Sequence, residues 1–309
     1  DTLLLTLKSL FKQTILPDEI LVIDDSTDNK TEELLHGLKK RSKTNIIYLK
    51  KNPKKRGTTF SRNLGIDKSL GEYLFFLDDD ITVYKDYIES SLDFFKKHED
   101  ANGIQWYAYS DHDSRYDLGK IKNLFMHLFY LGYYSENKSI VLPSMATVVP
   151  HPLTRDIKTE YVGAGTSVFR KSCLNGIRFD EKLTGYALQE DLDFSYRIHK
   201  KFGGLYLLKE RKLHHAYSLT GRMHLKKITY TKFVYLGYIF KKNIKQSPKN
   251  LLIFWWSMFG RLVMRIPNLI LRPSKLMLRE GIYTYQAIPS MALHFRNLEK
   301  NPNYFKEEM

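Results

Sequence analysis

The chain has 309 residues, of which 43% are hydrophobic and 27% are charged, so it can form one large α/β domain with an appendage or two modest domains. Its aromatic content of 14% and its few glycines and prolines exclude a disordered or fibrous protein. The single cysteine, Cys173, excludes an internal disulfide and a cysteine-based metal cluster, and it fits a reducing compartment.

The net charge of +15 is concentrated in one C-terminal block. Residues 211–279 contain 15 Lys or Arg and neither Asp nor Glu, so the rest of the chain has as many acidic as basic residues. Such a block suits phosphate, nucleic acid or an anionic membrane. Because no nucleic-acid-binding motif accompanies it, we expect an anionic membrane surface and not nucleic acid as its partner.

The first hundred residues alternate between helical and strand patterns. Apolar side chains recur at helical spacing over residues 3–11, and a short run rich in β-branched residues then predicts a strand at residues 19–23. The pattern continues with helices at residues 31–40, 59–70 and 84–97 and strands at residues 46–49 and 73–77. This alternation predicts an α/β fold whose mostly parallel sheet has helices on both faces.

The second half of the chain is less regular. Residues 106–160 are rich in Tyr, His and Asp, and we expect loops and one helix, residues 121–134, that shape a binding site. A helix at residues 191–202 and a strand at residues 205–208 follow. The apolar run Leu251–Gly260 is much shorter than the about 20 residues that span a bilayer. We therefore expect residues 223–309 to form a basic, aromatic, mainly helical extension.

The extension contains two adjacent tryptophans, Trp255 and Trp256, close to Arg261 and Arg265. Tryptophan beside basic residues is typical of a helix that lies in a membrane interface. Packing of the same helix on the domain is the alternative.

Three aspartates, Asp78, Asp79 and Asp80, end an apolar strand. Open α/β sheets bind their ligands at the carboxyl ends of parallel strands. Because side chains alternate along a strand, Asp78 and Asp80 would share one side. Two carboxylates there suit Mn²⁺ or Mg²⁺ bound together with substrate phosphates, and a solvated acidic turn is the alternative.

A second acidic group, Glu190 and Asp191, opens a predicted helix. One of these carboxylates could act as a general base toward a hydroxyl group, or both could only cap the helix and pair with its dipole. Asp193 and Arg197 lie four residues apart on the same helix, which predicts an ion pair along the helix face.

Asp24 and Asp25 end an earlier strand, and Arg62 lies on the helix before the acidic strand. One of the two aspartates could accept hydrogen bonds from a nucleoside, or cap the next helix. Arg62 could face a diphosphate, or neutralise the carboxylate cluster.

Two adjacent histidines, His214 and His215, precede Arg222. One imidazole could complete a metal shell together with carboxylates, and the pattern does not decide which. An arginine at position 222 could hold a leaving phosphate.

Five segments, taken in order, resemble the inverting family-2 glycosyltransferases of the GT-A fold. They are residues 9–14 (SLFKQT), 19–28 (EILVIDDSTD), 61–65 (SRNLG), 71–80 (GEYLFFLDDD) and 189–191 (QED). The resemblance runs from about residue 3 to about residue 222, so we assign residues 1–222 to a GT-A catalytic domain and the remainder to the extension.

The resemblance implies a nucleotide-diphosphate-sugar donor and a divalent cation, Mn²⁺ or Mg²⁺, held by Asp78 and Asp80. We add His214 as a candidate third ligand. Asp25, with Asp24, is expected to contact the nucleoside.

The remaining candidate donor-binding residues are Arg62, Asp79 and Arg222. The resemblance also implies that Asp191, beside Glu190, deprotonates the acceptor hydroxyl. A single displacement would then invert the anomeric carbon.

Proteins of this family normally begin with a strand and a nucleotide-binding loop, and this chain starts just after the corresponding point. The resemblance therefore predicts an N-terminally incomplete domain whose sheet lacks a central strand, unless another segment fills the gap. The segment Asp24–Asp28 also replaces the family's common Asp-Asp-Gly-Ser with Asp-Asp-Ser-Thr-Asp.

We expect an enzyme on the cytoplasmic face of the cell membrane that acts on a glycan or lipid-linked acceptor. Transfer to polyprenyl phosphate is an alternative, because that acceptor is already ionised. Residues 78–83 also resemble the nucleophile motif of haloacid-dehalogenase-like phosphatases, and an inactive or truncated transferase is the third alternative.

Overall fold

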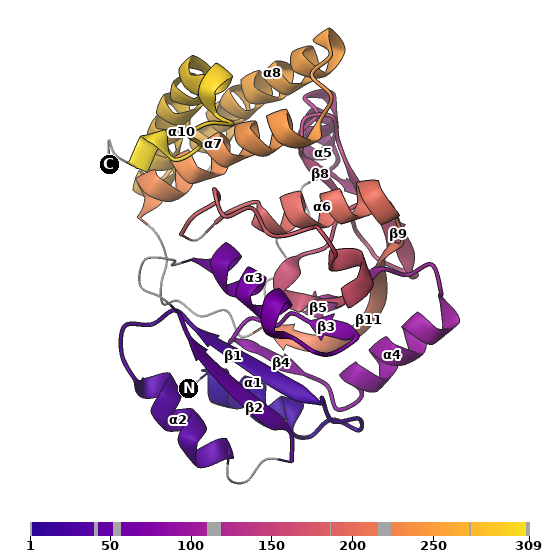
Figure 1. Ribbon diagram of the computed structural model, residues 1–309. Helices are drawn as coiled ribbons and strands as arrows, with labels where there is room; N and C mark the ends of the chain where they lie inside the picture. The colour runs from indigo at the N-terminus through magenta and orange to yellow at the C-terminus, as the bar shows by residue number, and fades with distance from the viewer. Residues whose placement is uncertain are drawn as a thin grey trace.

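The computed structural model of the protein describes residues 2–39, 43–51, 57–109, 119–185, 187–215, 224–271 and 273–306. An α/β body carries a layer of helices on one side (Figure 1). The helices of the body are α1 (Thr2–Leu10), α2 (Lys30–Lys39), α3 (Thr58–Lys68), α4 (Tyr87–Lys97), α5 (Lys120–Leu128) and α6 (Glu190–Phe202). The helices of the layer are α7 (Leu225–Asn243), α8 (Pro248–Val263), α9 (Arg265–Leu271) and α10 (Lys275–His294).

The strands form three sheets. Their bounds are β1 (Glu19–Asp24), β2 (Asn45–Lys50), β3 (Tyr73–Phe75), β4 (Ile81–Val83), β5 (Gly103–Tyr109), β6 (Tyr134–Ser135), β7 (Ile140–Val141), β8 (Thr147–Pro150), β9 (Ile157–Thr159), β10 (Ser167–Arg170) and β11 (Leu205–His215). The main sheet has the order β3-β10-β5-β11-β4, and β9 pairs with the first residues of β11. Strands β1 and β2 form a parallel pair, and β6, β8 and β7 form a small third sheet.

The main sheet is mixed, not mostly parallel as the alternating pattern predicts. β5 and β11 are parallel, but β10 runs antiparallel to both β3 and β5, and β4 and β9 run antiparallel to β11. A parallel neighbour needs a long crossover, usually a helix. Between β5 and β10 the described part of the chain forms α5 and the short strands β6 to β9, and β10 then pairs antiparallel with β5.

Helices cover both faces of the main sheet, as expected. Alternation along β10 shows this directly, because Val168 packs with Phe95 of α4 on one face while Phe169 packs with Phe194 of α6 on the other. Both β10 side chains are fully buried. Burial of each such apolar side chain contributes about 1.5–3 kcal/mol.

The predicted helices and strands of the first hundred residues are confirmed, and β4 is an additional short strand before α4. The middle of the chain differs more from the expectation of loops and one helix. Strands β5 to β9 lie there, and the helix α5 ends at Leu128. Strands β6 to β9 are only two to four residues long, so they lack the extended alternation that identifies a strand.

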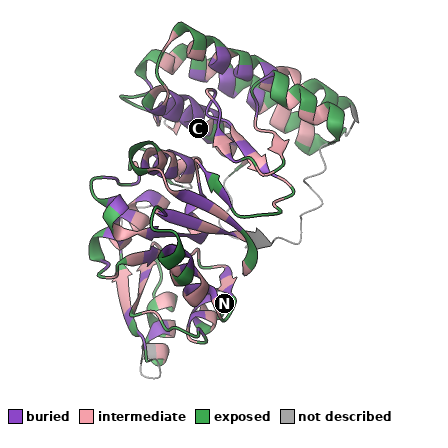
Figure 2. Cartoon of the chain, turned by 90° about the vertical axis from the view of Figure 1, so that its right-hand side faces the viewer, coloured by how far each residue is buried: buried purple, intermediate pink, exposed green. Residues whose placement is uncertain are grey.

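The C-terminal helices pack on the body through one shared core. Phe233 of α7, Phe254 of α8 and Met291 of α10 are buried in the same cluster as Leu183 and Leu192 of the body. Figure 2 shows this buried interior between the two layers. The two adjacent tryptophans have different environments, because Trp255 packs against this core while Trp256 is 41% exposed.

Among the residues that the structure describes, no helix combines the length and the apolar character needed to cross a membrane.

Candidate functional site

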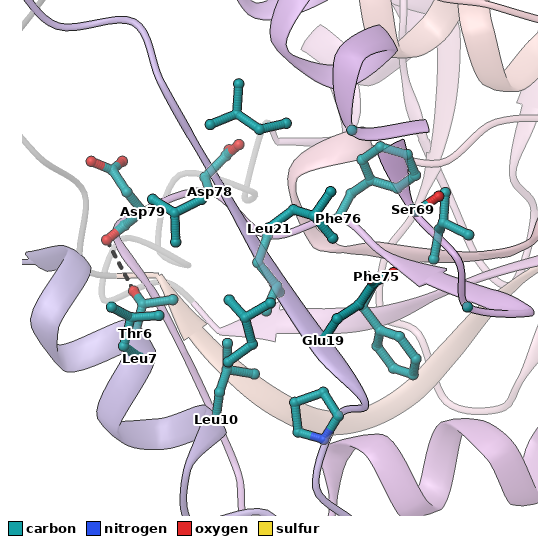
Figure 3. Close-up of a pocket in the computed structure, with 18 of the residues that line it drawn as sticks. Thr6, Leu7, Leu10, Glu19, Leu21, Ser69, Phe75, Phe76, Asp78 and Asp79 are labelled. Atoms are coloured by element: carbon teal, nitrogen blue, oxygen red, sulfur yellow. Dashed lines mark hydrogen bonds between the residues drawn. The ribbon is translucent and has the colours of Figure 1, made fainter. Parts of the chain in front are cut away.

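A cavity of about 900 Å³ lies between β1 and β3 (Figure 3). One end is apolar and includes Leu10, Leu21 and Phe75, and the other end is acidic and includes Asp78 and Asp79. In the part of the chain that the structure describes, β1 pairs with β2 and β3 pairs with β10, but no ladder joins β1 to β3. The cavity therefore lies between the edges of two sheets.

The acidic triplet turns sharply after β3. The Asp78 side chain is 46% exposed, and its backbone N–H donates to the Gly165 carbonyl over 3.1 Å. The Asp79 carbonyl accepts from the Thr6 hydroxyl (2.9 Å), and this hydrogen bond fixes the turn on α1 (Figure 3). Burial and the negative charges of Asp80 and Asp78 raise the pKa of Asp79. The triplet thus creates a negative potential that favours a cation.

Arg62 of α3 joins this triplet to the second acidic group. Its guanidinium lies 3.2 Å from the Asp78 carboxylate and 2.7 Å from the Glu190 carboxylate. The Arg62 side chain is only 11% exposed, so the contacts are made in a largely dry environment. The sequence predicts Arg62 either as a diphosphate contact or as a neutralising cation. The structure shows the second arrangement.

Glu190 and Asp191 stand at the first turn of α6, immediately after a strained segment. Ala187 and Gln189 both have positive φ, at 40° and 75°, which is uncommon for residues with a side chain. Burial and the neighbouring Asp191 charge raise the pKa of Glu190 to about 8, against the effect of Arg62. Burial also raises the pKa of Asp191. Carboxyl groups with raised pKa values are suited to proton transfer near neutral pH.

The loop Gly163–Gly165 passes between the two acidic groups. A Cβ atom at position 163 would lie 3.8 Å from an Asp191 oxygen, and one at position 165 would overlap the Asp78 carboxylate. At position 165 only a residue without a side chain can approach the Asp78 carboxylate this closely, whereas the 3.8 Å separation at position 163 is an ordinary van der Waals contact. The loop thereby brings Asp78 and Asp191 to the same site.

Gln105 of β5 holds this loop and was not identified from the sequence. Its Oε1 accepts from the Gly163 N–H (2.8 Å), and its Nε2 donates to the Thr166 hydroxyl (2.9 Å). A single glutamine beside a segment expected to be irregular carries no motif, so only the tertiary structure reveals its role.

Asp24 and Asp25 have different environments. Asp24 is buried and accepts hydrogen bonds from the Ser26 N–H (2.8 Å) and the Tyr48 hydroxyl (2.9 Å). Burial opposes ionisation, but these hydrogen bonds hold the pKa of Asp24 below its usual value. Asp25 accepts from the Gly57 N–H (2.7 Å), and its carboxylate lies 3.3 Å from the buried Lys51 ammonium group. Both aspartates line the acidic end of the cavity.

Of the two histidines, His215 lies at the acidic triplet, with its Nε2 3.0 Å from the Asp80 carboxylate. The predicted ligand, His214, precedes it on β11, and neighbouring strand residues point to opposite faces. The geometry therefore favours His215 over His214 as the histidine of this site. Arg222 lies outside the described residues.

The donor atoms fit a divalent cation without forming a complete cage. Among the described residues, no three His, Cys, Asp or Glu side chains are arranged as a ready-made metal site. Mg²⁺ and Mn²⁺ in sites for substrate phosphates use one or two carboxylates and take their other ligands from water and phosphate. The half-exposed Asp78 and the Asp80–His215 pair provide such a partial set.

Asp193, in contrast, is part of the structural framework. Its side chain is fully buried and pairs with Arg197 at 2.7 Å and with Lys242 at 3.0 Å. The predicted ion pair between Asp193 and Arg197 along the helix face is confirmed. Asp193 also forms an ion pair with Lys242 of α7.

Comparison with known proteins identifies the family. Residues 1–152 match the family described as Glycosyl transferase family 2. An uncharacterized glycosyltransferase of Rickettsia felis is 33% identical over 144 residues, which cover 47% of this chain and 21% of that protein. The minor teichoic acid biosynthesis protein GgaB of Bacillus subtilis is 26% identical over 250 residues, which cover 79% of this chain and 25% of GgaB. The chain thus spans a quarter or less of the length of these relatives.

A solved structure has a similar fold. The crystal structure of S. aureus TarS 1-349 in complex with UDP-GlcNAc superimposes with a TM-score of 0.56, covering 96% of this chain and 84% of that chain at 15% identity. The expected α/β GT-A fold is confirmed, and none of these matches points to a haloacid-dehalogenase-like phosphatase. By these comparisons the chain is similar to glycosyltransferases of family 2, most clearly over residues 1–152.

Proposed function

We propose that the chain transfers a sugar from a nucleotide-diphosphate sugar to an acceptor hydroxyl, with inversion at the anomeric carbon. One observation carries the proposal. Arg62 bridges Asp78 and Glu190, while the loop Gly163–Gly165 brings the Asp191 and Asp78 carboxylates to one site. A cation-attracting group and a candidate base thus share a single site beside a cavity large enough for a nucleotide sugar.

The proposed base is Asp191. Its raised pKa makes it a better proton acceptor than an ordinary aspartate, and the residue beside it, Gly163, has no side chain. The carboxylate would remove the hydroxyl proton as the oxygen attacks the anomeric carbon from the face opposite the leaving diphosphate. One displacement of this kind inverts the configuration, and no covalent intermediate with the enzyme is required.

The donor would be held at the acidic end of the cavity. Asp25 and Asp24 are the proposed nucleoside contacts, and Asp78, Asp80 and His215 would hold Mn²⁺ or Mg²⁺. When bound, the divalent cation supplies positive charge that stabilises the leaving diphosphate. Arg62 is a candidate to turn from Asp78 toward a donor phosphate, because guanidinium groups bind phosphate well.

The name of GgaB supports a role in cell-surface glycan synthesis. We therefore propose a glycan or lipid-linked acceptor and a peripheral location at the cytoplasmic face of the membrane. The block of positive charge in residues 211–279 supports contact with an anionic surface.

Donor binding tests the proposal. Binding and hydrolysis of a panel of nucleotide sugars would be measured with Mn²⁺, with Mg²⁺ and with EDTA, for the wild type and for Asp80→Ala. We expect one donor to bind in a metal-dependent manner and this binding to be lost in Asp80→Ala. Asp93→Ala, which removes an exposed carboxylate of α4, is the matched control. Metal-independent binding that survives in Asp80→Ala would contradict the proposed metal site.

The Asp191→Asn variant distinguishes the two acceptor classes. A hydroxyl acceptor needs a base, so we expect kcat to fall by about 100-fold or more. A polyprenyl phosphate acceptor is already ionised and would leave much of the activity in this variant.

A further inference from the structure

The helix α5 presents its apolar side to solvent. Ile121, Leu124, Phe125 and Leu128 recur at helical spacing, and all four are exposed, Ile121 by 74% and Leu124 by 67%. The polar side faces the protein instead, because the Asn123 side chain exchanges two hydrogen bonds of 3.0 Å with the Tyr134 backbone. An amphipathic helix normally packs in the opposite way, so this apolar stripe is available to a partner.

The exposed stripe continues onto α8. The Trp256 indole N–H donates to the Leu128 carbonyl over 3.0 Å, and the Phe129 ring lies 5.1 Å from the Trp256 ring and 6.2 Å from the Phe259 ring. A Cβ at Gly260 would overlap Phe129, so the two segments are in direct contact. Figure 1 shows α5 beside α8 at the junction of the body and the helical layer.

The outer side of α8 is apolar as well. Leu252, Trp256 and Phe259 are exposed by 71%, 41% and 51%, and they lie on the side of the helix opposite the buried Phe254. We call the two stripes together the α5–α8 surface, formed by Ile121, Leu124, Phe125, Leu128, Leu252, Trp256 and Phe259.

Lysines stand in the first turns of both helices of this surface. Lys120 and Lys122 stand in the first turn of α5, where no acidic residue accompanies them although the helix dipole favours one. Lys249 occupies the first turn of α8, which also lacks an acidic residue. The α8 helix belongs to residues 211–279, which contain no Asp or Glu. An apolar surface that includes an exposed tryptophan and is bordered by lysines matches the interface of an anionic bilayer.

We propose that the α5–α8 surface docks on an anionic membrane, with the apolar side chains in the headgroup region and the lysines at lipid phosphates. A helix of the catalytic body, and not only the C-terminal extension, would then fix the distance of the active site from the bilayer. This proposal rests on the peripheral location proposed above but not on the transfer chemistry.

Co-sedimentation with vesicles tests the proposal without any donor or acceptor. The full chain would be mixed with vesicles of phosphatidylcholine alone or of phosphatidylcholine with phosphatidylglycerol. We expect the wild type to prefer the anionic vesicles and to release them as salt is raised. In the double variant Leu124→Ser/Phe125→Ser we expect the affinity to fall by about 100-fold, since each lost side chain accounts for roughly a tenfold change.

The matched control is Leu5→Ser/Leu70→Ser, which removes two exposed leucines from α1 and the loop after α3, outside the α5–α8 surface. We expect it to bind vesicles like the wild type, and thermal unfolding would verify that both variants are folded. Equal binding by the two double variants would overturn the proposal. The proposal would also be overturned if the wild type did not bind vesicles. It would be overturned as well if the wild type formed dimers and the Leu124→Ser/Phe125→Ser variant were monomeric. Donor binding is measured separately, so these outcomes leave the proposed enzymatic function unaffected.

Discussion

Gly165 determines how closely the chain approaches the Asp78 carboxylate. A Cβ at this position would overlap that carboxylate, whereas one at Gly37 in α2 would meet no atom within 4 Å. We expect Gly165→Ala to displace Asp78 and to lower kcat/KM about 100-fold, because a shift of about 1 Å in a catalytic group has an effect of this size.

Steady-state kinetics with the identified donor, together with thermal unfolding, would measure the effect of Gly165→Ala. The control Gly37→Ala should keep full activity. Wild-type activity in Gly165→Ala would show that Asp78 does not need its present position.

Glu190 should make the stability of the protein depend on pH. Its pKa in the folded chain is about 8, compared with an ordinary value of 4.5, so the folded state keeps a proton that the unfolded chain releases between these values. The stabilisation by this proton is complete below pH 4.5 and is lost as the pH rises toward about 8. We therefore expect Glu190→Gln to flatten the fall in stability over this range.

Urea unfolding of Glu190→Gln at several pH values would test this expectation, with the exposed Glu99→Gln as a control that keeps the wild-type profile. The slope should decrease without vanishing, because burial raises the pKa of Asp191 as well. A profile identical to that of the wild type would mean that Glu190 is ionised throughout.

The residue types of the candidate site could be predicted from the sequence, but their hydrogen-bond and ion-pair partners could not. Asp78, Asp80 and Asp191 follow strand or helix patterns that a reader can recognise, and the structure brings Asp78 and Asp191 to one loop. The partners Gln105 and Lys51 were missed, because their roles depend on which strands become neighbours. The choice between His214 and His215 depends in the same way on how β11 pairs with β4.

At the scale of elements, Asp193 ties α6 to α7. Its buried carboxylate contacts Arg197 on its own helix and both Lys242 and Asn243 on α7. Removal of one member of a buried charged network leaves the others unpaired and typically costs about 3–5 kcal/mol. We expect Asp193→Ala to lose about this much in the free energy of unfolding.

Denaturant unfolding would measure the loss in Asp193→Ala against Asp93→Ala, which breaks an exposed pair with Lys96 at 3.6 Å. Exposed pairs contribute about 0–1 kcal/mol, so the control should remain close to the wild type. Similar losses in both variants would argue against a structural role for the contact between α6 and α7.

The helices and strands of the first hundred residues were predictable because their apolar side chains repeat at the spacing of each element. The strands β6, β7 and β9, at two or three residues each, are too short to show such a repeat. The apolar stripe of α5 follows helical spacing in the sequence, but its exposure is visible only in the structure. Its exposure follows from the hydrogen bonds of Asn123, which turn the polar side inward.

At the scale of the whole molecule, the boundary near residue 222 is clear in the amino-acid composition. In the structure, the parts on either side of it are not clearly separated. The change to a basic, aromatic composition marks the extension. Its helices nevertheless share a core with the body, in which Leu183 and Leu192 pack with residues of α7, α8 and α10. Hydrophobic contacts between segments that are distant in sequence leave no local sequence pattern. Composition alone therefore suggests that the extension is more independent of the body than it is in the structure.

We therefore expect residues 1–222 to be unable to fold alone. Without the helical layer, Leu183, Ala187 and Leu192 would become exposed, and the Asp193 carboxylate would lose Lys242 and Asn243. Circular dichroism during thermal unfolding should show a cooperative transition for the full chain and none for residues 1–222. Co-expression of residues 223–309 should restore the transition, because the interface is largely apolar and needs no covalent link. A cooperative transition in residues 1–222 alone would instead show that the body is an independent domain and that the shared core only attaches the extension to it.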